Sequence, residues 1–377
     1  MPVRHLCPRF LPARHRGEPA NLAPPFARPQ TIRNVGYLPV IAAELAVASH
    51  TSGSIVAYDA ASLKPVWKYP LAKSYEPSMP YAGAIVCSQN SLWINDDGVI
   101  AIVDLQTGRE ISRAPGPPGV DLLNGVVISD LLITAIDSAD TSYVACFRGS
   151  DWQNPVWQFE MASPTMLVAA SEKLCCYGKS SHELAGVDLE SGAERWSFSV
   201  AELGRYVDPV GQPGAGETTS AVAVFGDRVI VGVCGYRIVA IDSNSGKLAW
   251  SHEVGALTPA SLAVDAAGIL HILDFTGYWR VRISDGKLLN QLEVETSLRA
   301  NRMTMVNQID VSETHVFAAG AYGTLFAMRQ ETGVIEWTHL LSGQGRFGNY
   351  PIATEGGLWH LDANGNLLRF KVASRRS

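Results

Sequence analysis

Short apolar segments separated by polar turns follow one another from about residue 32 to the end of the chain. Some of these segments are apolar throughout, as in Val229–Val233, and others alternate apolar and polar residues. Both patterns are typical of β-strands, whereas an amphipathic helix would place apolar residues three and four positions apart. The sequence therefore predicts an all-β protein without a convincing helix.

One frame recurs along the chain: an apolar strand ending in Ala-x-Asp, a polar turn closing on Gly, and a Trp four residues after that Gly. Its clearest copy consists of Ala240, Asp242, Gly246 and Trp250. Further copies, one with a longer turn, lead to Trp67, Trp157, Trp196 and Trp337, and two weaker copies carry Ser112 and Asn290 in place of the Trp. The frame is the signature of a repeat architecture.

Each copy is preceded by two more strand-like segments, so one repeat contains four short strands. The turns that open the third strand fall near Gly53, Gly98, Ser142, His182, Tyr236, Gly277, Gly323 and Gly365, at intervals of 40 to 54 residues. A four-stranded repeat of about 40–45 residues has the size of a propeller blade. We therefore expect an eight-bladed β-propeller with four-stranded antiparallel blades.

The last copy ends with a third strand at Leu367–Phe370, and no fourth strand follows it. The segment before the first blade is the available donor, so we expect an N-terminal strand to complete the last blade. Seven blades are the alternative, if the last segment packs irregularly.

The five repeated Trp residues have a physical task in such a fold. A side chain of this size buries about 150–250 Å², and a position on the outer strand places it in the seam between two blades. The small residue before the Asp leaves room for it, and the Gly permits a turn with positive φ. We therefore assign Trp67, Trp157, Trp196, Trp250 and Trp337 to docking between blades and not to chemistry.

Residues 1–30 differ from the rest of the chain, because they contain seven prolines, five arginines and one acidic residue. We expect a flexible tail there, followed by a single propeller domain over residues 31–374; the alternative is that Phe26 to Arg33 adds an edge strand. The net charge of the whole chain is −6, which gives no electrostatic reason to bind nucleic acid. No apolar run is long enough for a membrane span, and no signal peptide or lipobox is visible. The expectation is a cytoplasmic monomer.

The Ala-x-Asp-x-x-Ser/Thr-Gly-Lys-x-x-Trp frame resembles the tryptophan-docking repeat of the PQQ-like, or quinoprotein-type, β-propeller family. That family includes PQQ-dependent alcohol dehydrogenases and also a non-catalytic lipoprotein of the outer-membrane β-barrel assembly machinery. In length, the chain looks more like the latter. The resemblance implies the propeller fold and leaves two functions open, a protein-binding scaffold and a PQQ-dependent enzyme.

Within the family, the dehydrogenases carry a vicinal disulfide beside the cofactor, and Cys175–Cys176 is the only adjacent pair of cysteines here. The pair falls on a predicted second strand, where neighbouring side chains point to opposite faces. No local motif provides the calcium ligands or the catalytic Asp of the dehydrogenases, and no C-x-x-C or zinc-finger spacing is present. We therefore expect no cofactor, no metal site and no enzymatic activity; PQQ with calcium, in a quinoprotein dehydrogenase, is the alternative.

Arg, Tyr and Asn residues gather in the segments that join successive blades. The largest insertion, Leu203–Thr218, carries Arg205 and Tyr206. Two further connections carry Arg299, Asn301 and Arg302, and Arg346, Phe347, Asn349 and Tyr350. Arg and Tyr are enriched at the centres of protein interfaces, so these nine residues are the predicted contacts with a protein or peptide partner. The alternative is that the loops are polar only because water surrounds them.

Overall fold

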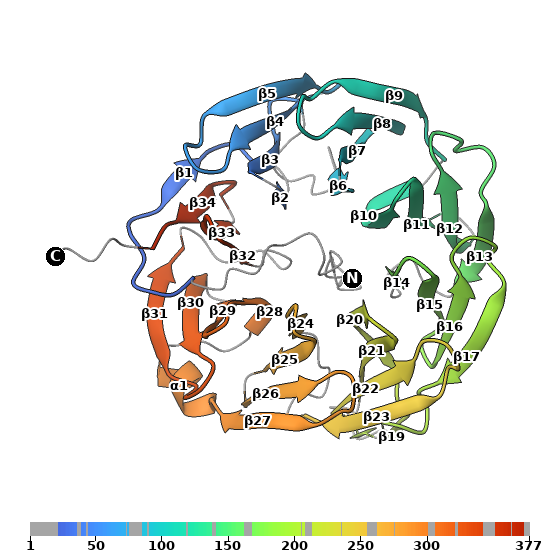
Figure 1. The fold of residues 1–377 in the computed structure, drawn as a ribbon, viewed down its shortest axis with the longest axis vertical. Helices are drawn as coiled ribbons and strands as arrows, with labels where there is room; N and C mark the ends of the chain where they lie inside the picture. The colour runs from blue at the N-terminus through green and yellow to red at the C-terminus, as the bar shows by residue number, and fades with distance from the viewer. Residues whose placement is uncertain are drawn as a thin grey trace. The chain divides into compact units, whose positions relative to one another are not determined.

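A computed structural model of the chain describes residues 22–35, 39–42, 44–72, 74, 85–88, 90–117, 120–137, 141–161, 168–204, 206–207, 213–234, 236–254, 262–274, 276–300, 306–320, 323–341, 351–362 and 364–372. Eight four-stranded antiparallel sheets occur in it, and the fold is an eight-bladed β-propeller (Figure 1). The predicted eight blades are confirmed, and the alternative of seven is wrong. The chain divides into two compact units, with boundaries near residues 113 and 291.

The unit formed by residues 114–291 holds blades 3 to 6, and their strands pair in chain order. Blade 3 consists of β10 (Val120–Ile128), β11 (Leu131–Asp137), β12 (Ser142–Arg148) and β13 (Trp157–Met161), and blade 4 of β14 (Val168–Ala170), β15 (Leu174–Ser180), β16 (Glu183–Asp188) and β17 (Glu194–Ser199). Blade 5 consists of β20 (Thr218–Phe225), β21 (Arg228–Val233), β22 (Arg237–Asp242) and β23 (Leu248–Glu253), and blade 6 of β24 (Leu262–Val264), β25 (Ile269–Leu273), β26 (Gly277–Arg282) and β27 (Leu288–Glu293).

The other unit holds blades 1, 2, 7 and 8. Blade 1 consists of β2 (Val40–Ala42), β3 (Leu45–His50), β4 (Ser54–Asp59) and β5 (Pro65–Pro70), and blade 2 of β6 (Ile85–Cys87), β7 (Ser91–Asp96), β8 (Val99–Asp104) and β9 (Glu110–Pro115). Blade 7 consists of β28 (Val306–Val311), β29 (His315–Gly320), β30 (Thr324–Arg329) and β31 (Ile335–Leu340). Blade 8 is built from both ends of the chain, in the order β32 (Ile352–Thr354), β33 (Gly357–Leu361), β34 (Leu367–Phe370) and β1 (Gln30–Ile32).

The N-terminal strand that completes blade 8 is confirmed, since β1 pairs antiparallel with β34. Contacts with the blades also extend further toward the N-terminus than the boundary expected at residue 30. Leu22 is buried, and Phe26 forms an isolated bridge with Val372. Residues 1–21 of the expected tail lie outside the described residues.

Two small elements interrupt the repeat. A two-stranded hairpin, β18 (Tyr206–Val207) and β19 (Pro213–Gly214), lies within the insertion between blades 4 and 5. A single helical turn and a half, α1 (Glu295–Ala300), follows β27, although the sequence led us to expect no helix. The helix is too short for a periodic pattern to reveal it, and only Leu298 of its six residues is buried. An ion pair between Glu295 and Arg299, four residues apart, supports it.

The seam between blades 4 and 5 shows how the repeated residues are used. The indole Nε1 of Trp196 donates a hydrogen bond to the carbonyl of Ser243 at 2.8 Å. A Cβ on Gly246, which has a φ of 67°, would come within 2.4 Å of Trp196, and a Cβ on Gly186 within 2.1 Å. The indole therefore fills the space between its own blade and the third-to-fourth-strand turn of the next blade, and both glycines are needed for that fit.

The same contact recurs within each unit. Trp67, Trp157 and Trp250 donate from Nε1 to the carbonyls of Leu105, Leu189 and Ile283 at 3.0, 2.8 and 2.8 Å, and lie against Gly108, Gly192 and Gly286. Asp242 and its counterparts accept hydrogen bonds from the backbone of the same turn, as from the N–H of Ser245 at 2.9 Å. Among the Trp residues assigned to docking, Trp337 has a different partner, described with blade 8 below.

Candidate functional site

One end of each blade carries both its second-to-third-strand turn and its connections to neighbouring blades, because the strands are antiparallel. We call it the loop end of the blade. The predicted partner-binding residues belong to connections at the loop ends of blades 4, 6 and 7. Arg299 lies on α1, where its side chain is two-thirds exposed and pairs with Glu295, and Tyr206 lies on β18. The other seven, Arg205, Asn301, Arg302, Arg346, Phe347, Asn349 and Tyr350, lie outside the described residues.

The insertion between blades 4 and 5 has a neck in which two backbone segments touch. The N–H of Gly216 donates to the carbonyl of Ala201 at 2.9 Å. A Cβ on Gly204 would lie 1.9 Å from the carbonyl oxygen of Cys234, and one on Gly216 would lie 2.2 Å from that of Val200. No other residue type has room at either position. The strands β18 and β19 begin only two residues beyond Gly204 and end two residues before Gly216.

The neck is also bonded to the blades on either side of it. The carbonyl of Gly216 lies 2.8 Å from Nδ1 of His182, and the N–H of Thr218 donates to the carbonyl of Ser181 at 2.8 Å. The carbonyl of Glu217 accepts the N–H of Cys234 at 2.7 Å. These bonds fix the base of the hairpin against blades 4 and 5, within one unit. The sequence predicts the insertion but not the neck, although two glycines twelve residues apart are a signal for it.

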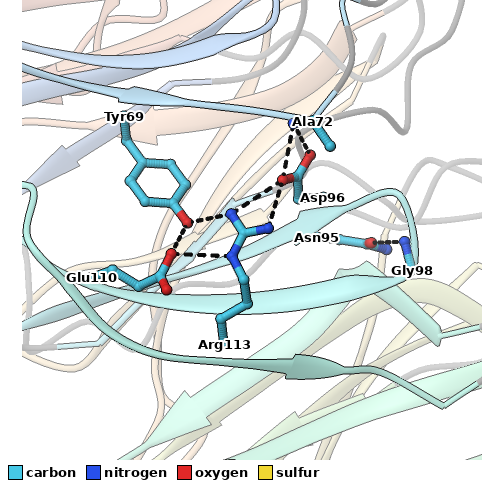
Figure 2. Close-up of polar contacts among 7 residues, drawn as sticks. All are labelled: Tyr69, Ala72, Asn95, Asp96, Gly98, Glu110 and Arg113. Carbon is cyan, nitrogen blue, oxygen red and sulfur yellow. Dashed lines mark hydrogen bonds and ion pairs between the residues drawn. The ribbon is translucent and has the colours of Figure 1, made fainter.

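A second connection between blades is held in place in the other unit, where a buried carboxylate supports the segment that joins blades 1 and 2 (Figure 2). Asp96 ends β7, and its side chain has no exposed surface. Its two oxygens accept the N–H of Ala72 at 2.8 and 3.1 Å, just beyond β5. Arg113 of β9 lies 3.4 Å from the same carboxylate and compensates its charge.

Arg113 continues this network toward the surface. Its Nη2 donates to the hydroxyl of Tyr69 at 2.6 Å, and its Nε donates to Glu110 at 3.1 Å. Tyr69 in turn donates to Glu110. Burial and this hydrogen bond raise the pKa of Tyr69, while the bonds from Tyr69 and Arg113 lower the pKa of Glu110. Tyr69 therefore keeps its proton at neutral pH. The network holds the connection between blades 1 and 2 in place, and its carboxylates are already bonded and do not act as a general base for catalysis.

Replacing Asp96 by Asn tests this support. The change removes the charge that faces Arg113, and we expect a loss of about 1–2 kcal/mol in the free energy of unfolding, since Arg113 is partly exposed and screened by water. Hydrogen exchange at the Ala72 amide should become at least tenfold faster. The control is Asp97→Asn, which removes the same charge from an exposed neighbour. If Asp96→Asn left the exchange of Ala72 unchanged, the carboxylate would not hold the connection.

The cysteine pair does not fit the role that the family resemblance suggested. Cys175 and Cys176 are free and fully buried on β15. Cys175 faces the core shared by blades 3 and 4, and Cys176 faces the core shared by blades 4 and 5. Burial raises the pKa of Cys176 to about 12 and that of Cys175 well above its ordinary value. Two thiols on opposite faces of a strand cannot form a vicinal disulfide without breaking the strand.

The described part of the chain contains no group of three or more His, Cys, Asp or Glu residues suited to hold a metal ion. In the same residues, no helix has the length and apolar character needed to cross a membrane.

Comparison with known proteins gives one family match. Residues 153–377 match the family model described as outer membrane protein assembly factor BamB. No curated protein sequence matches the chain significantly.

Three solved structures are similar to the chain over most of its length. BamB from Moraxella catarrhalis is 14% identical with a TM-score of 0.62, and the match covers 92% of this chain and 99% of that one. Quinohemoprotein alcohol dehydrogenase ADHIIG from Pseudomonas putida HK5 is 9% identical with a TM-score of 0.62, covering 93% and 78%. The computationally designed Ika8 protein is 14% identical with a TM-score of 0.63, covering 90% and 96%. A designed protein matches as well as the two natural ones, so these likenesses concern the fold alone.

Proposed function

Since this chain belongs to the family described as outer membrane protein assembly factor BamB, we propose that it is a non-catalytic β-propeller that binds a protein or peptide partner through the loop ends of its blades. The observation that carries this proposal is the fixed neck of the insertion between blades 4 and 5. Gly204 and Gly216 hold β18 and β19 on a base bonded to both neighbouring blades.

A fixed base matters for binding because residues that are already held in place lose little conformational entropy when a partner docks. The hairpin is also the place where the chain departs most from its own repeat, with the 54-residue interval between the third strands of blades 4 and 5. Loops that depart from a repeat are the usual positions of function on a scaffold. The sequence of the insertion includes Arg205 and Tyr206, which are residue types expected at the centre of such an interface.

Shortening the hairpin is the direct test. In the variant, residues 206–213 are replaced by a Gly-Ser-Gly linker while Gly204 and Gly216 stay in place. A partner captured from the source cells by crosslinking is then purified, and its affinity is measured by calorimetry. We expect the variant to bind at least tenfold more weakly than the wild type, and Arg299→Ala, Arg302→Ala and Arg346→Ala to map the rest of the surface.

Val66→Ala serves as the control for this experiment, because Val66 is exposed on the outer strand β5, away from the loop end. The control should bind like the wild type. Equal affinity of the shortened variant and the wild type would remove the hairpin from the interface.

The alternative function is a PQQ-dependent quinoprotein dehydrogenase, supported by the repeat frame that the chain shares with that family. Titration of the purified chain with PQQ and calcium distinguishes the two functions. Saturable binding at micromolar PQQ together with dye-linked oxidation of alcohols or sugars would favour the enzyme. We expect neither, since Cys175 and Cys176 do not form the disulfide that accompanies the cofactor in that family.

A further inference from the structure

The outer strand of blade 8 is held by fewer residue pairs than the outer strands of blades 1, 3, 4, 5 and 7. Its outer strand β1 pairs with β34 through three residues, Gln30 with Arg369, Thr31 with Leu368, and Ile32 with Leu367. The outer strand of blade 1, by comparison, pairs through five. No covalent turn connects β34 to β1, because the two strands come from opposite ends of the chain.

Side chains of the same N-terminal segment compensate for the short pairing. Leu22 is 3% exposed, and its carbonyl accepts a hydrogen bond from the hydroxyl of Ser312 at 2.8 Å. Phe26 packs edge-to-face on Trp337, with ring centroids 4.9 Å apart, and also contacts Phe317 at 6.1 Å. Ile32 is buried in the core shared by blades 8 and 1.

Phe26 takes the place that a turn occupies in the other seams. Trp196 and its counterparts lie against the glycine of the third-to-fourth-strand turn of the next blade. Blade 8 has no such turn, so Trp337 has no glycine to cover. Its indole contacts Phe26 on one side, and Phe370 of β34 at 5.2 Å on another.

Between these anchors the segment is exposed and is bonded through its backbone. Ala27, Arg28, Gln30 and Thr31 are exposed, and the N–H of Ala27 donates to the carbonyl of Lys371 at 2.8 Å. Leu22 and Ile32 are buried and Phe26 is partly buried. Apolar anchors of this kind, exposed residues between them and backbone bonds to a sheet edge are the features of a peptide added to a sheet as an extra strand.

We propose that blade 8 is a strand-acceptor site whose resident ligand is residues 22–32, and that it takes the same segment from a second copy of the chain. In the monomer the segment is retained because the connection to β2 keeps its effective concentration high. Exchange between two copies needs no contact beyond those seen here, since each acceptor would receive an identical segment.

The test begins with the full chain, carrying a protease site between Val35 and Pro39, so that the propeller folds before it is cut. After cleavage, a fluorescent peptide of residues 20–35 is added in excess, as a probe for the segment of a second copy. We expect it to displace the cleaved fragment and to bind with a saturable anisotropy change. A Phe26→Ala peptide should bind at least tenfold more weakly, and the matched Arg28→Ala peptide within about twofold of the native one.

A second measurement uses a chain that cannot close on itself. Deleting residues 36–38 shortens the connection between β1 and β2, and we expect this chain to sediment as a dimer that becomes monomeric when Phe26→Ala is added. Failure of excess peptide to displace the cleaved fragment, or equal affinity of the native and Phe26→Ala peptides, would overturn the proposal. Because the substitutions are in the peptide, the folding of the propeller does not affect this comparison.

Discussion

Replacement of Trp196 by alanine is expected to lower the free energy of unfolding by about 4 kcal/mol. The side chain is 7% exposed and fills the space between Gly186 of its own blade and Gly246 of the next. Neither glycine has a side chain that could move into the cavity. The variant also leaves the carbonyl of Ser243 without the indole N–H that it accepts at 2.8 Å. Urea titration followed by the remaining tryptophan fluorescence measures the loss.

Two further variants separate the contributions to this loss. Trp196→Phe keeps an aromatic ring in the seam but removes the hydrogen bond to Ser243, so we expect an intermediate effect. Leu248→Ala is the control, because Leu248 is exposed on the outer strand of the neighbouring blade, and its replacement should change the free energy of unfolding by less than about 0.5 kcal/mol. A Trp196→Ala variant as stable as this control would show that the seam does not depend on the indole.

Acidification from pH 7 to pH 4.5 is expected to lower the free energy of unfolding by about 2–3 kcal/mol through the protonation of His360 alone. His360 lies buried on β33, and its Nδ1 has no hydrogen-bond partner. Burial lowers the pKa of His360 to about 4; Asp362 raises it and His339 lowers it further. The unfolded chain takes up this proton near pH 6.5, whereas the folded chain resists it until about pH 4. The contribution of neutral His360 to the stability is therefore fully present above pH 6.5 and is lost as the pH falls toward 4.

The variant His360→Leu isolates this contribution, since it removes the titrating group and keeps an apolar side chain in the core. Its free energy of unfolding should fall less between pH 7 and pH 4.5 than that of the wild type, by the same 2–3 kcal/mol. Carboxylates titrate in both proteins and cancel in the difference. The imidazole resonances of His360 in the wild type give its pKa directly. Parallel pH profiles of the two proteins would contradict the assignment.

The blades were predictable because the same physical requirement is met many times. Ala240, Asp242, Gly246 and Trp250 each serve one part of a seam, and repetition makes even incomplete copies visible. The turn of blade 1 shows the limit of this approach. There Leu63 adopts a φ of 59°, where other copies of the turn have Gly. The outer strand of the preceding blade, blade 8, is β1, and it carries no Trp that would need a glycine in this turn. Leu63 packs against the core of blades 8 and 1 instead.

Contacts that occur once could not be predicted in the same way. Phe26 lies in a proline-rich stretch with no repeat, so its place on Trp337 follows only from the way the chain ends meet. The carboxylate of Asp96 is indistinguishable in sequence from the exposed Asp97 beside it, and only its burial under Ala72 and Arg113 separates them. The predicted partner residues likewise occupy connections, where each loop has its own length and conformation. Arg299 was predicted there, but its pairing with Glu295 on a helix was not.

The closure of blade 8 has a mechanical consequence. Tension between the N-terminus and the rest of the chain reaches Leu22 first, then Phe26, and then the three residue pairs of β1. In the other blades, the third and fourth strands are joined by a covalent turn, so a load of this kind does not reach their outer strands until blade 8 has opened. A propeller pulled by its N-terminus therefore yields in a fixed order: the release of Phe26 exposes the ring of Trp337, and the unpairing of β1 then exposes the edge of β34.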